Sequence, residues 1–122
     1  MPRPVTTVRH MTDEAAQVRA HELFDPIAEG YLSRDGVDIG PMFGSEGLRI
    51  RGKVFAFVGY RGSLVVKVPE ARADEVVASG TAERMEMRGR AMREWLVVAP
   101  DAAEHWGPLT AEAFAYVDEL TP

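Results

Sequence analysis

The sequence predicts an α+β domain, in which a small, mainly antiparallel sheet of about four strands has helices packed against it. Apolar residues recur at helical spacing near both ends of the chain and alternate as in strands through its middle. Short glycine turns separate the middle strands, which is typical of antiparallel hairpins. The predicted order is two helices, three strands, a helix, a strand and a terminal helix.

The chain is expected to form one domain behind a loose N-terminal arm. Its 122 residues match the length of a single domain. Residues 1–10 contain two prolines and no periodic pattern, so we expect an arm there and one folded domain over residues 11–122. Thr12 has a side chain that caps helices well, and it is predicted to start the first helix.

A second helix is predicted directly after the first. Proline is tolerated at the first position of a helix, so Asp25 is expected to cap a new helix that begins at Pro26 and runs to about Leu32. Residues 33–41 are rich in turn formers and predict a loop.

The middle of the chain predicts three strands. Leucine and isoleucine alternate with arginine just before Gly52, which is the pattern of a half-exposed strand. Arg51 and Gly52 are expected to form a two-residue hairpin turn in which Gly52 has a positive φ. Val54–Val58 is apolar on both faces and predicts a central strand. Residues 64–68 alternate as a third strand.

The last third of the chain predicts a helix, a strand and a terminal helix. Glu70–Ser79 carries an apolar helical stripe and is followed by a glycine, which favours a helix end there. Residues 81–91 are polar and are expected to form a connection that contains a turn. Met92–Ala99 returns to a strand pattern, and Thr110 is predicted to cap the terminal helix.

Two aromatic side chains are expected to be large core anchors. Trp95 shares one face of its predicted strand with Val97, and Phe114 lies on the apolar face of the terminal helix. Burial of such side chains contributes strongly to stability, so both are predicted to be sensitive to truncation.

Composition favours a cytoplasmic protein. The chain has no cysteine, which excludes disulfides, thiolate metal sites and a catalytic cysteine. Its longest apolar runs are about five residues, whereas a membrane-spanning helix needs about twenty. The net charge is −5, which disfavours nonspecific nucleic-acid binding. Residues 42–98 are nevertheless net basic, with ten basic and seven acidic residues.

The sequence contains no pattern that identifies a catalytic or metal site. The three histidines, His10, His21 and His105, lack the spacing of zinc ligands, so we expect no metal and no cofactor. No serine lies in a nucleophile-elbow pattern. Residues 44–47 contain two glycines but lack the spacing and lysine of a phosphate-binding loop, which favours a structural role. We therefore expect a protein that is not an enzyme.

Four segments resemble the N-terminal domain of the TfoX/Sxy family of competence regulators. They are MFGSEGL at residues 42–48, GKVFA at 52–56, LVVKV at 64–68 and GRAMREW at 89–95. Eight residues carry the motif and are expected to be mainly structural: Met42, Phe43, Gly44, Gly47, Gly52, Lys67, Met92 and Trp95. Ser45 stands where the family commonly has glycine. The similarity is to a stand-alone N-terminal domain, without the second, helical domain of the longer regulators.

The resemblance implies a non-enzymatic regulatory or protein-interaction domain, with a protein partner connected to transcription. The candidate contacts are the arginines of one charged segment: Arg84, Arg88, Arg90 and Arg93. Arginine is suited to acidic protein surfaces and to phosphates, but glutamates interleave with this segment. Two alternatives stay open at this point: direct nucleic-acid binding through the same arginines, and a small-molecule-binding domain or enzyme with a pocket that no motif announces.

Overall fold

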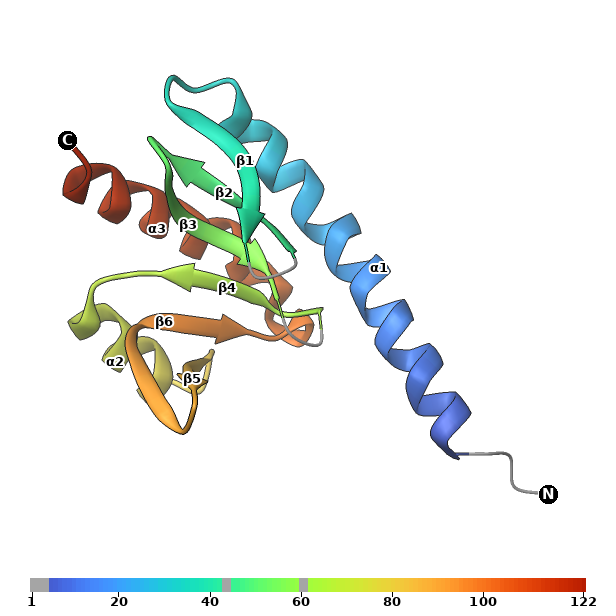
Figure 1. Cartoon of the computed structure of the whole chain (residues 1–122). Helices are drawn as coiled ribbons and strands as arrows, with labels where there is room; N and C mark the ends of the chain where they lie inside the picture. The colour runs from blue at the N-terminus through green and yellow to red at the C-terminus, as the bar shows by residue number, and fades with distance from the viewer. Residues whose placement is uncertain (1–4, 43–44, 60–61) are drawn as a thin grey trace.

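In the part of the chain that the structure describes, six antiparallel strands form one sheet, and three α-helices pack against it (Figure 1). The structure is a computed structural model that describes residues 5–42, 45–59 and 62–122. The strand order is β1-β2-β3-β4-β6-β5. In chain order the elements are α1 (Val5–Leu32), β1 (Val37–Met42), β2 (Ser45–Ile50), β3 (Lys53–Val58), β4 (Leu64–Lys67), α2 (Glu70–Ala78), β5 (Glu83–Met87), β6 (Arg90–Val98), the 3-10 helix η2 (Pro100–His105) and α3 (Trp106–Leu120). The α+β class is confirmed, with six strands instead of the expected four.

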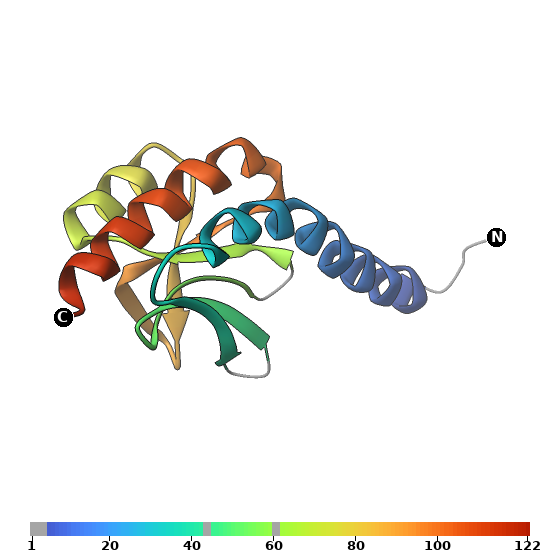
Figure 2. The same cartoon turned by 90° about the horizontal axis from the view of Figure 1, so that it is seen from above.

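All three helices lie on the same side of the sheet (Figure 2). Phe24 of α1, Val76 of α2 and Leu109 of α3 belong to one buried cluster together with side chains from the strands. Within the described ranges, no helix lies against the opposite side of the sheet. The sheet therefore has one helix-covered face and one face that no other element covers, which we call the open face.

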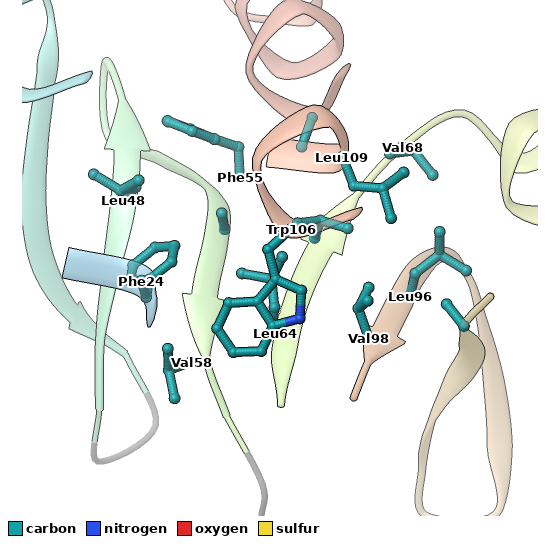
Figure 3. Packing of buried hydrophobic residues seen from close by; sticks show 14 of the residues in the cluster. Phe24, Leu48, Phe55, Val58, Leu64, Val68, Leu96, Val98, Trp106 and Leu109 are labelled. Atoms are coloured by element: carbon teal, nitrogen blue, oxygen red, sulfur yellow. The ribbon is translucent and has the colours of Figure 1, made fainter. Parts of the chain in front are cut away.

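Trp106 is the largest fully buried side chain and lies at the centre of the cluster in Figure 3. Its indole Nε1 donates a hydrogen bond of 3.1 Å to the carbonyl oxygen of Ala99, which satisfies its one polar atom. The expectation that Trp95 and Phe114 are the large core anchors is therefore wrong in part. Phe114 packs against the core while partly exposed, but Trp95 lies on the open face because the strand alternation turns it away from the helices.

The predicted central strand is confirmed. β3 lies between β2 and β4, and its last four residues are buried. A bulge contributes to this burial, because Leu48 pairs with Ala56 while its neighbour Arg49 pairs with Val54. Phe55 is left without a partner residue across the strand pair and packs against aromatic rings of α1 and α3.

The predicted hairpin turn at Arg51 and Gly52 is also confirmed. Both residues have positive φ, 48° and 86°, as in a type I′ turn. The turn brings Arg51 to the end of α3, where its guanidinium donates hydrogen bonds to the main-chain oxygens of Asp118, Thr121 and Pro122. The Asp118 carboxylate also lies 2.7 Å from the same guanidinium. A residue in a turn thereby caps a helix that is distant in sequence.

The two strands that were not predicted are the two edges of the sheet. β1 lies in the region expected to be a loop and contains Gly40 and Pro41, which disfavour strands except at an edge. β5 lies in the polar segment 81–91 and alternates charged residues with methionine. An edge strand has one partner and tolerates charge and proline, so its sequence differs little from that of a loop.

The N-terminal helices predicted on either side of Asp25 are one continuous helix. α1 contains Pro26 in its interior and begins at Val5, within the segment expected to be an arm. An interior proline removes one helical hydrogen bond and costs about 3 kcal/mol. The buried residues Phe24 and Ala28 flank this position, and Pro26 itself is exposed. Packing on both sides of the proline therefore holds the helix together.

The helices of the last third agree with the prediction at one end and differ at the other. α2 ends as expected, since the amides of Gly80 and Thr81 bond back to the carbonyls of Val77 and Val76 in a Schellman arrangement. The terminal helix, however, starts at Trp106 and not after Thr110, which is fully buried inside it. The preceding η2 leads the chain into α3 without a side-chain cap.

We predict that Gly52→Ala destabilises the domain, whereas Gly30→Ala does not. A Cβ has open space at both positions, but Gly52 has a φ of 86° and Gly30 lies in α1. The strained conformation should cost about 1–3 kcal/mol at position 52, while alanine in a helix gains up to about 1 kcal/mol. Urea denaturation of both variants measures this difference. Equal effects at the two positions would contradict the turn assignment.

We predict that Trp106→Ala lowers the free energy of unfolding by about 3–5 kcal/mol, because it opens a cavity at the centre of the core. Trp95→Ala should cost only about 1–2 kcal/mol, since that ring is half-buried on the open face and packs edge-on against Phe57. Denaturant midpoints with an unchanged slope give both values. A larger loss at Trp95 than at Trp106 would show that the core assignment is wrong.

Candidate protein-interaction surface

The hairpin formed by β5 and β6 carries most of the candidate residues. Arg88 and Gly89 form its two-residue turn, with φ of 56° and 78°. Both hairpin turns of this kind in the described ranges thus place an arginine before a glycine. Arg90 closes the turn opposite Met87. Arg88 and Arg90 are exposed, and neither forms an ion pair with another described residue.

The hairpin bends sharply along β6. Arg84 pairs with Leu96 and Glu86 pairs with Ala91, so two steps along β5 correspond to five steps along β6. The extra residues of β6 form a bulge, and bulges bend and twist a strand. The bend produces a hollow of about 720 Å³ that is lined by Glu70 and residues 90–95.

Trp95 lies in this hollow and connects it to the open face. Its ring packs edge-on against Phe57, with ring centroids 6.1 Å apart. Lys67, its partner across the β4–β6 pair, places its ammonium 5.9 Å from the indole centroid. A cation at this distance is attracted to the face of the ring. A half-buried tryptophan of β6 is thus held by contacts to residues of β3 and β4.

A second hollow of about 420 Å³ adjoins the first at the Phe57–Trp95 pair. Its floor is part of a row of paired residues that crosses five strands on the open face: Gly47, Phe57, Val65, Val97 and Glu83. A Cβ on Gly47 would lie 3.2 Å from Val54 and 3.3 Å from Phe57, so glycine leaves room for these side chains. Glu83 and Glu86 line the same hollow and are exposed.

The four candidate arginines are not brought to one surface. Arg93 is 76% exposed and lies 3.7 Å from Glu70, so it extends toward solvent together with Arg88 and Arg90. Arg84 differs, because its guanidinium bonds to Asp74 of α2 at 2.8 Å and its side chain is only 22% exposed. Three arginines therefore share the exposed part of the hairpin, and Arg84 ties β5 to α2.

The residues of the family motif also fall into two groups. The bent hairpin brings together Met92, Trp95 and Lys67. The two glycines have structural roles, because Gly47 leaves room for neighbouring side chains and Gly52 adopts the positive φ of a turn. Phe43 and Gly44 lie outside the described residues, and so does the side chain of Met42. Residues 45–47 of the segment 44–47 are the first residues of strand β2, in agreement with a structural role.

Sequence reasoning did not predict the contacts that Glu94 of β6 makes within the domain. Glu94 lines the larger hollow, accepts a hydrogen bond from the Tyr116 hydroxyl of α3 and lies 3.8 Å from the ammonium of Lys67. This hydrogen bond, together with burial, raises the pKa of Tyr116 to about 12. The negative charge of Glu94 is thereby partly compensated from within the domain.

Comparison with protein-family models matches residues 32–113 to the TfoX N-terminal domain. The chain belongs to the TfoX N-terminal domain family. The match runs from the last residue of α1 into the middle of α3, so it includes the whole sheet and the bent hairpin. No curated protein and no solved structure matches the chain.

This TfoX N-terminal domain was also searched for metal sites and for membrane-spanning helices. Across the described part of the chain, no three histidine or acidic side chains gather where they could hold a metal ion. Of the described helices, none is both long and apolar enough to cross a membrane.

We predict that one tyrosine of this domain ionises near pH 12 and that Glu94→Gln lowers its pKa toward the ordinary value of about 10. The hydrogen bond favours the protonated phenol in the folded state. Its contribution to stability is therefore complete below pH 10 and is lost as the pH rises toward about 12. Phenolate absorbance during an alkaline titration measures the pKa, and Tyr116→Phe identifies the signal. An unchanged titration in Glu94→Gln would contradict the contact.

Proposed function

We propose that this TfoX N-terminal domain is a non-enzymatic protein-interaction domain with a regulatory role, and that its contact surface is the open face with the bent β5–β6 hairpin. The observation that supports this most is the placement of Trp95. It is half-buried on a face that no described helix covers, and it lies beside the exposed arginines Arg90 and Arg93. Tryptophan and arginine are the residue types enriched at the energetic centres of protein interfaces.

Rigidity supports the same proposal. The indole of Trp95 is held by Phe57 and Lys67, so little conformational freedom would be lost when a partner covers it. The type I′ turn at Arg88 and Gly89 likewise fixes the end of the hairpin. A surface that is ordered before binding gains affinity, because less entropy is lost on association.

A nucleic-acid partner is the alternative that the same arginines suggest. Glu83, Glu86 and Glu70 line the hollows beside them and would repel phosphates. We therefore expect DNA binding no tighter than the ordinary nonspecific range of about 10⁻⁴–10⁻⁶ M at physiological salt. Contacts from three arginines would give a log–log salt slope of about −2.7. Submicromolar binding with such a slope would replace the protein-interaction proposal.

We predict that the immobilised chain captures a protein from native lysate and that Arg90→Glu with Arg93→Glu abolishes the capture. Reversed charges at the centre of an interface remove favourable contacts and add repulsion. Arg19→Glu with Lys53→Glu is the matched control, because both residues are exposed outside the hollows and the net charge changes equally. Capture that survives the first pair, or that both pairs abolish, would contradict the proposed surface.

A further inference from the structure

The first half of α1 extends beyond the rest of the domain (Figures 1 and 2). The domain holds this helix at Ala16 and Gln17. A Cβ on Gly62 would lie 2.6 Å from the main-chain oxygen of Ala16, and the Gln17 amide donates a hydrogen bond of 3.2 Å to the carbonyl oxygen of Gly59. Within the described ranges, no other element lies beside residues 5–15 in either view, so about three turns of helix project from the domain.

The domain packs against only one side of α1. Ala20 and Phe24 are buried in the core, and Ile27 packs against it. Successive residues of an α-helix are about 100° apart around its axis, which places these three residues on one side of α1. Ala15 and Val18 fall on the opposite side, and both are exposed, Val18 to 60%. The projecting part of α1 therefore has a side that points away from its own domain.

An apolar stripe with heptad spacing runs along this outer side. Its residues follow one another at intervals of three, four and three positions: Val8, Met11, Ala15 and Val18. This spacing is that of the a and d positions of a coiled coil. Ala20 then takes position f, opposite the seam, in agreement with its burial in the domain. The next two seam positions hold Glu22 and Asp25, so the stripe ends at Val18.

The charged residues beside the stripe are complementary to those of an identical helix that runs parallel. Glu14 takes position g, and Arg19 takes position e of the following heptad. In a parallel two-stranded coiled coil, residues at g and e form ion pairs between the helices, and the two partners are five residues apart in sequence. Glu14 of each copy would therefore meet Arg19 of the other. An antiparallel pair would bring the two Glu14 residues together, and like charges in an interface are unfavourable.

We propose that the projecting part of α1 pairs in parallel with the same part of a second copy of this chain. Both domains then lie at the same end of the pair and on its outer sides, because domain and stripe occupy opposite sides of α1. The helices separate after Val18, where charged residues replace the stripe. The open face takes no part in this pairing, so the inference goes beyond the proposed function and does not depend on it.

Sedimentation equilibrium of the purified full chain measures the pairing. Because the seam is only about two heptads long, we expect a weak dimer with a Kd on the order of 10⁻⁵–10⁻⁴ M. Ala15→Glu with Val18→Glu should weaken it by at least about tenfold, since both changes place charges in an apolar seam. Val77→Glu with Leu120→Glu is the matched control, because it replaces two exposed apolar residues outside α1 and changes the net charge equally. The control should dimerise like the wild type.

The orientation is tested by mixing two further variants. Glu14→Arg and Arg19→Glu should each weaken the dimer, because each places like charges opposite one another in a parallel pair. In the equimolar mixture every reversed charge meets one of opposite sign, so the two variants should form a heterodimer that neither forms with itself. This rescue also shows that both variants are folded.

The outcomes separate this inference from the proposed function. A wild-type chain that is monomeric at about 10⁻³ M, or a dimer that Ala15→Glu with Val18→Glu leaves intact, overturns the pairing of α1. Two weakened charge variants that fail to combine in the mixture also overturn it, because parallel pairing requires the rescue. A chain that pairs through α1 but captures no protein through Arg90 and Arg93 overturns the proposed function alone.

Discussion

Burial of one face of the sheet is the constraint on which the rest of the structure depends. Three helices serve that single face, and Trp106 fills the space between α3 and the strands beneath it. Because all three helices in the described part of the chain pack on that face, the open face has only the strands of the sheet to shield it. The bent hairpin provides this shielding, which is why Phe57 and Val65 are almost inaccessible without any helix above them. The apolar side chains of the open face are therefore buried by the hairpin and not by a helix.

Much of the sheet could be predicted because its determinants are local. The glycine of the Arg51–Gly52 turn and the apolar run of β3 each specify their conformation within a few residues. The edge strands could not be predicted in this way. β1 contains glycine and proline and β5 is mostly charged, so only the presence of a neighbouring strand makes either of them a strand. The conformation of these two edge strands therefore depends on tertiary contacts and not on their local sequence.

The candidate surface could likewise be predicted only where it depends on residues close together in the sequence. Alternation along β6 separates Trp95 from Leu96, but it does not say which of the two faces the helices cover, and Leu96 is the one that is buried against them. The closeness of Arg90 and Arg93 follows from the sequence alone. The removal of Arg84 from that group does not, because its partner Asp74 comes from α2. The spacing of residues along the sequence does not predict a contact of this kind between two separate elements.

The contact between Arg51 and the end of α3 has a consequence for how the domain opens. Helix ends ordinarily fray, since their last carbonyl groups lack partners. Here the guanidinium that occupies those oxygens belongs to a hairpin turn of the sheet. Because Arg51 holds these carbonyl groups, we expect local opening at the end of α3 to be coupled to the β2–β3 hairpin.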